Sequence, residues 1–334
     1  MNDQLRNDYS GTEFVRDYQL IRTLLKREGC TLKRAGRVVE VEYHGKICHI
    51  SYTETTYTSI LAFRILKDKC VARSLFERIG ANTATGAAFE LNDRSAALEM
   101  VKELGLSVIK PADGNKGKGV SVGVSPKNFD DAWESAIEFS TSKVLVEQCF
   151  DGGVEARYLV IDGKCVAVCS RIPPFVIGDG VSSIKELNES RDNLRMKYNP
   201  SRKRKKTIID EHRKNLLAES GFTIDSVPGR GERVLLDWKA GLSTGGDSRN
   251  ITSQVHPEMM QVAESIAWAI PGLDIYGVDI LARDHASKPT KDNYIIIEAN
   301  TRPGLSGHQY PDFGETIDVC SLFVESLMRR MRIR

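Results

Sequence analysis

Apolar residues recur at intervals of three and four along several segments of the chain, which places them on one face of a helix. Ser183 and Glu186 have the spacing of a capping box and predict the start of one such helix. Pro257 suits the first position of another. The pattern predicts helices over 14–28, 59–79, 94–104, 129–140 and 257–270, and others starting at 183 and near 315.

Alternating or unbroken short apolar runs predict strands between these helices. His44-Gly45 and Asp162-Gly163 each separate two such runs, as in the two-residue turn of a β-hairpin. Residues 196–206 are expected to form an exposed, mobile loop. The predicted strands are 37–43, 46–52, 107–114, 143–150, 158–161, 164–170, 275–282 and 293–300. Helices combined with so many hairpins predict a mixed α and β class with more antiparallel pairing than a Rossmann fold has.

The composition is that of a globular protein large enough to need no disulfides or structural metal. The chain has 334 residues, of which 41% are hydrophobic and 28% are charged. No apolar run approaches the ~20 residues that span a bilayer, and the first residues have no apolar core typical of a signal peptide. Seven cysteines without a CxxC pair favour the reducing cytoplasm.

Positive charge is concentrated in one segment. Residues 185–215 hold eleven Lys and Arg against five Asp and Glu, although the net charge of the whole chain is only +2. The run RKRKK at 202–206 raises the alternative of nucleic-acid binding. We do not expect a nucleic-acid partner, because no aromatic residues are interleaved to stack on bases. An anionic small substrate or a solvated loop remain the alternatives for this segment.

A loop rich in glycine and lysine follows the predicted strand that ends near Lys110. Gly114, Gly117 and Gly119 would let backbone N–H groups approach phosphate oxygens, and the lysines would neutralise phosphate charge. The loop is not a Walker A motif, because GxxxxGK[ST] is absent. On these residues alone, an exposed turn is the competing interpretation.

Three side chains with oxygen ligands lie on two neighbouring predicted strands. Glu298 and Asn300 point to the same face because strand side chains alternate. Asp279 lies within an apolar strand, where an unpaired carboxylate is costly. If the strands pair, the three can converge as ligands for Mg²⁺. The alternative is an acidic edge that faces solvent.

The segment TRPGLSGHQYP follows Asn300 directly and predicts a rigid loop beside the metal ligands. Arg302 and His308 could hold a substrate carboxylate there. A structural hydrogen bond is the alternative role for His308.

These constellations occur in the order found in ATP-grasp carboxylate–amine ligases. The chain resembles the ATP-grasp part of cyanophycin synthetase and of bifunctional glutathione synthetases from about residue 49 to residue 318. The most specific stretches are LKDKCVARSLFERIGANT, SVIKPADGNKGKGV, VLVEQCFDGGVEARYLVIDGKCVAV, IGDGVSSIKEL, GLSTGGDSRNITSQVHPE, IYGVDIL and IIIEANTRPGLSGH.

The resemblance implies an α+β ATP-grasp fold that holds the nucleotide between two α+β lobes, beside a small N-terminal lobe. The implied lobes are 1–68, 69–148 with a lid loop, and 149–334 with the metal site.

The resemblance also implies roles for individual residues. Contacts to ATP are implied for Lys69, Lys110, Gly114, Lys118, Gly119, Glu155 and the adenine hinge Glu147, Gln148, Cys149 and Phe150. Catalytic roles are implied for Arg171, Lys116 and Arg302, and substrate contacts for Arg157, Asn250, Ser306 and His308. The implied metal ligands are Asp279, Glu298 and Asn300, which the residue pattern had already indicated.

The activity implied is ATP-dependent ligation of a carboxylate to an amine through an acyl phosphate, with amino acids or a small peptide as substrates. The cofactors would be ATP and two Mg²⁺, with Mn²⁺ as an alternative metal. We expect a cytoplasmic homo-oligomer without a membrane or nucleic-acid partner. The competing functions are a small-molecule kinase on the same scaffold and a non-catalytic nucleotide-binding regulator.

Two positions depart from the family pattern. Asn250 stands where an aspartate is usual, and Gly277 stands where D-alanine ligases carry an arginine. Arg171 or a basic loop residue could supply the missing charge. The second halves of cyanophycin synthetase and of the bifunctional glutathione enzymes have no counterpart here, so neither full activity is implied.

Overall fold

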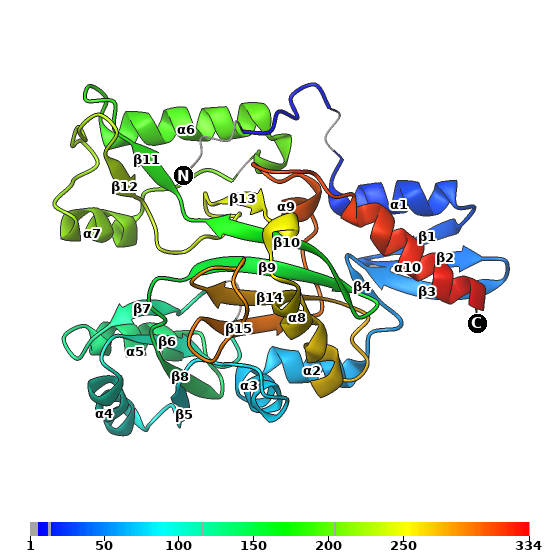
Figure 1. The fold of residues 1–334 in the computed structure, drawn as a ribbon, viewed down its shortest axis with the longest axis horizontal. Coiled ribbons are helices and arrows are strands. Elements are labelled where there is room, and N and C mark those ends of the chain that lie inside the picture. The colour runs from blue at the N-terminus through cyan, green and yellow to red at the C-terminus, as the bar shows by residue number, and fades with distance from the viewer. Residues whose placement is uncertain (1–5, 13–14, 115–116, 204, 334) are drawn as a thin grey trace.

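The computed structural model describes residues 6–12, 15–114, 117–203 and 205–333. Lys116, one of the predicted catalytic residues, lies outside these ranges, as do the first position of the predicted helix 14–28 and one arginine of the basic run. Three antiparallel sheets follow one another along the chain, each with its own covering helices (Figure 1). The architecture is α+β, as expected, and has the ATP-grasp arrangement.

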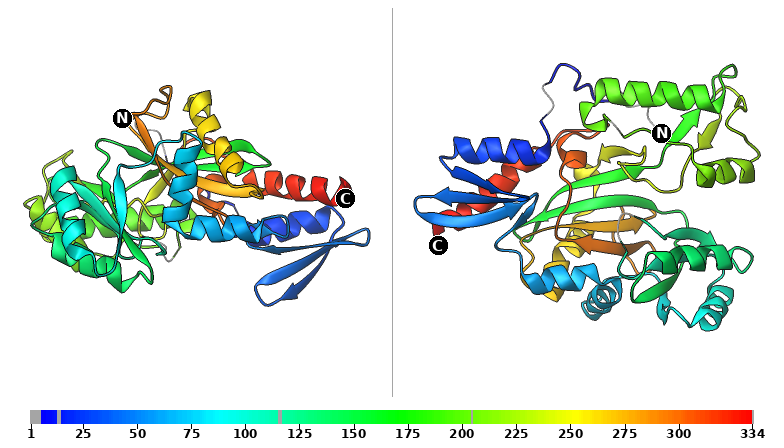
Figure 2. Two further views of the ribbon diagram at one scale, coloured as in Figure 1. Left: turned by 90° about the horizontal axis from the view of Figure 1, so that it is seen from below. Right: turned by 180° about the vertical axis from the view of Figure 1, so that it is seen from behind.

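The N-terminal sheet is covered by the first and last helices of the chain, α1 (Asp17–Arg27) and α10 (Val319–Ile333), which lie side by side (Figures 1 and 2). Its strands, in spatial order, are β1 (Thr31–Ala35), β2 (Val38–Tyr43), β3 (Lys46–Ser51) and β4 (Glu54–Thr55). The predicted turn at His44-Gly45 is confirmed, with φ of 50° and 77°. The shared core consists of Ile21, Leu25, Val39, Val41, Cys320, Phe323, Val324, Leu327 and Met331.

The predicted single helix over 59–79 is wrong, because the chain bends at Asp68. The segment forms α2 (Ile60–Lys67) and α3 (Lys69–Arg78). The carboxylate of Asp68 accepts hydrogen bonds from the N–H groups of Cys70 and Val71, at 2.9 and 3.2 Å. A side chain that caps a new helix in this way ends the preceding one.

The central sheet has the spatial order β5 (Gly86–Glu90), β8 (Lys143–Gln148), β6 (Ser107–Pro111) and β7 (Ser121–Val124). Helices α4 (Arg94–Leu104) and α5 (Phe129–Glu138) cover it, and both were predicted. Phe129 and Trp133 stack in the core between α5 and the sheet.

The largest sheet has the order β13 (Asp247–Asn250), β10 (Lys164–Ile172), β9 (Val154–Ile161), β14 (Ile275–Ala282) and β15 (Tyr294–Asn300). One face packs on α8 (Pro257–Ala269) together with α2 and α3. The division into lobes at 68/69 and 148/149 stays a prediction.

A two-stranded sheet, β11 (Phe175–Ile177) with β12 (Arg233–Leu235), extends the large lobe and packs on α6 (Ile184–Tyr198) and α7 (Glu211–Glu219). The capping box of Ser183 and Glu186 is confirmed. No helix among the described residues is long and apolar enough to cross a membrane.

The prediction of an exposed, mobile loop over 196–206 is wrong. A 3₁₀ turn, Pro200–Arg202, lies in the protein interior, and the side chain of Arg202 is 0% exposed. Its guanidinium pairs with Asp312 at 2.7 Å. The partner lies far away in the sequence, so the local pattern gives no sign of this burial.

The positive charge of residues 185–215 is largely paired within the protein. Arg191 and Arg195 both contact Asp247, at 3.0 and 2.7 Å, and Arg213 contacts Asp237 at 2.7 Å. These arginines are therefore not a free basic surface, and the segment no longer supports an anionic substrate.

Candidate active site

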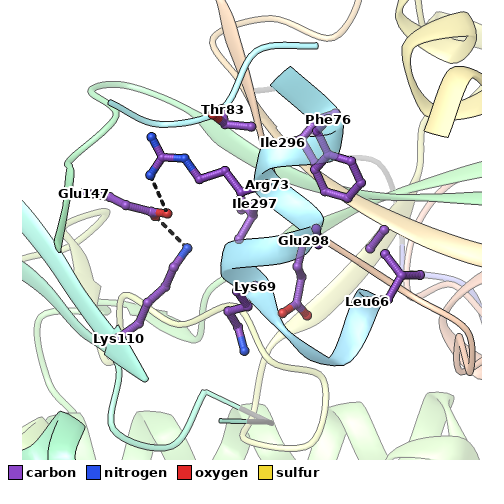
Figure 3. Close-up of a pocket in the computed structure, with 12 residues that line it drawn as sticks. Leu66, Lys69, Arg73, Phe76, Thr83, Lys110, Glu147, Ile296, Ile297 and Glu298 are labelled. Atoms are coloured by element: carbon purple, nitrogen blue, oxygen red, sulfur yellow. Dashed lines mark ion pairs between the residues drawn. The ribbon is translucent and has the colours of Figure 1, made fainter. Parts of the chain in front are cut away.

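A cleft lies between the central sheet, helix α3 and the edge strand β15 (Figure 3). Charged side chains from all three elements line it together with apolar ones. The lining residues are Leu66, Lys69, Ala72, Arg73, Phe76, Thr83, Lys110, Glu147, Ile296, Ile297, Glu298 and Ala299. The cleft thus brings together Lys69, Lys110 and Glu298, which the sequence had singled out separately.

Lys69 is the first residue of α3, and the Asp68 cap fixes its position. Its Nζ donates to the carbonyl oxygen of Gly114 at 2.6 Å, which ties the helix to the glycine-rich loop. Burial lowers the pKa of Lys69, Glu298 opposes this shift, and Lys110 adds to it. Two lysines held this close favour a ligand that brings negative charge.

Lys110 and Arg73 share one carboxylate. Lys110 Nζ lies 2.6 Å from Glu147 Oε2, and Arg73 Nη1 lies 3.5 Å from Glu147 Oε1 (Figure 3). Sequence reasoning missed Arg73. It stands four residues after Lys69, so helical spacing puts both on one face of α3 and could have indicated it.

The glycine-rich loop is described except for residues 115–116. Gly119 has φ of 66°, and a Cβ there would lie 2.8 Å from the carbonyl oxygen of Ser135, so only glycine fits without a shift. Lys118 is exposed, and its Nζ lies 5.5 Å from the centre of the Phe139 ring. This lysine is available to a ligand only if it leaves that ring.

The predicted adenine hinge uses two of its N–H groups within the protein. Gln148 N donates to Thr85 O at 2.7 Å, and Cys149 N donates to Leu106 O at 2.9 Å. Those two groups are not free to bind a base. The role of Phe150 stays a prediction.

A buried cluster of arginines and carboxylates lies on the face of the large sheet opposite α8. Arg157, Asp279 and Glu298 occupy directly opposed positions on β9, β14 and β15. Arg157 holds both oxygens of Asp279, with Nη2 at 2.6 Å from Oδ2, and Arg171 adds a contact at 3.2 Å. Burial alone would raise the pKa of Asp279, but the two guanidinium groups outweigh it and hold that pKa below its usual value.

Glu155 belongs to the same cluster. It accepts a hydrogen bond from Arg171, and burial raises the pKa of its carboxyl despite that partner. Its predicted role as the ribose ligand therefore requires Arg171 to share it.

The three predicted metal ligands differ in how free they are. Glu298 and Asn300 lie on one face of β15, and their side chains have no hydrogen bond or ion pair to any described residue. Asp279 is 2% exposed and is occupied by two arginines. No cluster of three His, Cys, Asp or Glu suited to a metal occurs among the described residues. The donors therefore fit Mg²⁺ at Glu298 and Asn300, whereas Asp279 serves here as an arginine partner.

Gly277 explains how the family's missing arginine is compensated. A Cβ at this position would lie 2.8 Å from Arg157 Cδ and 3.1 Å from Pro303 Cβ. The Arg157 side chain therefore occupies the space above Gly277. A neighbouring strand supplies the positive charge, rather than Arg171 alone.

The predicted pairing of Arg302 and His308 around a substrate carboxylate is wrong. His308 is 3% exposed, and burial together with Arg157 and Arg171 lowers its pKa to about 3, so the ring is neutral. Arg302 lies with Glu54, its Nε 2.9 Å from Oε2. A neutral, buried imidazole cannot balance a carboxylate.

Two further predicted substrate residues differ in their surroundings. Asn250 is buried and fully engaged, since its Nδ2 donates to Glu315 O at 2.5 Å and its Oδ1 accepts from Thr252 N at 2.9 Å. The structure therefore gives Asn250 a structural role. Ser306 is half-buried at the start of α9 (Ser306–Gln309).

Comparison with known proteins is consistent with this geometry. The family model described as the carbamoyl-phosphate synthase L chain, ATP binding domain, matches residues 68–172. Cyanophycin synthetase of Crocosphaera subtropica is 32% identical over 306 residues, which cover 88% of this chain and 34% of that protein. The glutathione biosynthesis bifunctional protein GshAB of Pasteurella multocida is 30% identical over 278 residues, covering 80% of this chain and 36% of that protein.

Similarity also extends to a solved structure. The crystal structure of a bifunctional glutathione synthetase from Pasteurella multocida matches with a TM-score of 0.67 and 26% identity, covering 94% of this chain and 43% of that one. The chain spans about a third of the length of the two relatives named above, 34% and 36%.

Proposed function

Because this chain is an ATP-grasp protein, we propose that it is an ADP-forming ligase that joins a carboxylate to an amine. The substrates are amino acids or a small peptide. One observation carries the proposal: Lys69, Lys110 and Glu298 converge in one cleft between two lobes. A carboxylate without this phosphate-binding charge would not be activated.

The reaction has two steps. A carboxylate oxygen attacks the γ-phosphorus of ATP, the bond to the bridging oxygen breaks, and ADP leaves. The amine then attacks the acyl carbon, loses a proton, and expels inorganic phosphate. Phosphate is a better leaving group than the hydroxide that direct condensation would release.

The chain's own residues would supply positive charge and exclude water. Lys69 and Lys110 would neutralise the phosphates in a partly buried site, where charge interactions are stronger than in water. Arg157 and Arg171 would face the acyl phosphate from the sheet. Glu298 and Asn300 would hold Mg²⁺, which neutralises phosphate charge during transfer.

The substitution Glu298→Ala tests the proposal. We expect ADP release to fall to background, because the freest predicted metal ligand is lost, while the melting temperature stays within a few degrees of wild type. Glu138→Ala, at an exposed position at the end of α5, is the matched control and should retain activity. Normal turnover by Glu298→Ala would sink the metal assignment.

The assay also separates the competing functions. ADP release is measured with pairs of carboxylates and amines, and the product is identified by mass spectrometry. A phosphorylated product without a carboxylate would identify a kinase. ATP binding without ADP release from any pair would identify a non-catalytic regulator.

We also propose a cytoplasmic location and a homo-oligomeric state. All seven cysteines are free thiols, which agrees with a reducing compartment. Size-exclusion chromatography with light scattering tests the oligomeric state directly.

A further inference from the structure

A second pocket lies between the N-terminal lobe and the loop that follows the predicted metal ligands. Its walls come from α1, from the turn between β3 and β4, and from residues 302–304. The empty space is about 340 Å³, which is at the small end for ligand pockets. It therefore suits a molecule much smaller than a nucleotide.

Tyr52, at the turn between β3 and β4, has an unusual backbone for its residue type. Its φ is 57°, and the other described non-glycine residues with positive φ are His44 and Asp162. Those two precede a glycine in a hairpin turn, whereas Tyr52 precedes Thr53. A bulky side chain at positive φ is strained, and such strain clusters at functional sites.

The ring of Tyr52 faces the pocket instead of the core. The residue is 47% exposed, and its ring meets the ring of Tyr18 edge to face at 6.1 Å. Nothing in the packing of the N-terminal sheet requires a tyrosine here. The two rings, with Ile21, form an apolar wall that an aliphatic or aromatic side chain would fit.

Arg302 gives the pocket a site for a carboxylate. Its guanidinium carbon lies 5.6 Å from the centre of the Tyr52 ring, and its Nε lies 2.9 Å from Glu54. Its two terminal nitrogens have no hydrogen bond to any described residue. A guanidinium fork of this kind binds a carboxylate through two parallel hydrogen bonds.

Asp17 adds a negative charge at the same pocket. Its Oδ2 accepts from Leu305 N at 3.2 Å, which fixes the carboxylate at the pocket wall. A pocket with a guanidinium, a carboxylate and an apolar wall matches the three parts of a free α-amino acid.

We propose that this pocket binds the amine-supplying substrate, a free α-amino acid with an aliphatic or aromatic side chain. The carboxylate of the amino acid binds Arg302, its ammonium group lies toward Asp17, and its side chain packs on Tyr18 and Tyr52. The assignment of this amino acid as a substrate rests on the proposed ligase function.

Binding of L-phenylalanine and L-leucine, measured by calorimetry with ADP and Mg²⁺ present, tests the pocket. Tyr52→Gly should raise the melting temperature by relieving the strain, yet weaken binding by at least about tenfold, which is 1.4 kcal/mol. His44→Gly is the matched control, since it relieves similar strain in the same sheet away from the pocket. It should bind both amino acids as wild type does.

Arg302→Leu provides a second variant. Wild type should bind L-phenylalanine more tightly than L-phenylalaninamide, which lacks the carboxylate, and Arg302→Leu should lose this preference. Wild-type affinity in Tyr52→Gly, or no binding of either amino acid to wild type, would overturn the pocket. Amino-acid binding without ADP release from any substrate pair would overturn the ligase proposal while supporting the pocket.

Discussion

His308 is an uncharged side chain placed beside two guanidinium groups. Burial and the charges of Arg157 and Arg171 lower its pKa to about 3, and its Nδ1 has no hydrogen-bond partner. The pKa of an unfolded histidine is about 6.5. Between these values the unfolded chain binds a proton that the folded protein does not. Stability attributable to His308 is therefore present above pH 6.5 and falls as the pH drops toward 3.

The substitution His308→Leu should remove this pH dependence. Between pH 7 and pH 5, the wild-type free energy of unfolding should fall by about 2 kcal/mol more than that of the variant. Urea unfolding at both pH values measures the difference, and comparing the two proteins cancels the contribution of the buried His285. Equal losses in the two proteins would show that His308 can be protonated in the fold.

Residue-level prediction worked where strand alternation alone fixes a side chain. Glu298 and Asn300 share a face of β15 as expected, and Asp279 stands opposite Glu298. The arginine partners of Asp279 depend on the register with β9 and β10, which no local pattern encodes. Sequence reasoning could therefore find the carboxylate but not what neutralises it.

The break at Asp68 shows how one polar residue divides an apolar pattern into two elements. Apolar spacing runs through 59–79 without interruption, so periodicity predicts one helix. The Asp68 carboxylate instead binds the first N–H groups of α3 and places Lys69 at its start. Hairpin turns were easier to predict, since a dipeptide ending in glycine encodes them locally. Strand β1 was missed because its sequence TLKRA is mostly exposed and polar.

The substitution Asp68→Ala should destabilise the protein by about 1 kcal/mol, the usual contribution of a helix N-cap. Asp68→Ser keeps a capping oxygen and should retain most of the stability. Chemical denaturation of the three proteins provides the measurement. An alanine variant as stable as wild type would mean that packing alone sets the break between α2 and α3.

Across the whole molecule, buried ion pairs connect the segment of highest charge to distant parts of the chain. Asp312 is 0% exposed and accepts from Arg202 and Arg6, while Asp247 accepts from Arg191 and Arg195. Sequence arithmetic located the charge correctly. It could not show that the charge is internal, because the partners come from separate elements.

The substitution Arg202→Ala should destabilise the protein by about 3 kcal/mol or more, since it leaves Asp312 buried with fewer partners. Lys206→Ala, in the same basic run but exposed, should change stability by less than about 0.5 kcal/mol. Thermal and urea unfolding test both variants. Equal effects would mean that the run acts as a surface charge, and a salt-dependent gel shift would then be the next measurement.

The packing of α10 against α1 also orders events during synthesis. The strands around Val39 and Val41 leave the ribosome early, but residues 319–331, which complete their core, leave last. At about 5–20 residues per second, the interval is on the order of tens of seconds. The first lobe to be translated is thus the last to be finished. Its apolar sheet face must stay shielded in the meantime, which makes the nascent chain a natural client for chaperones.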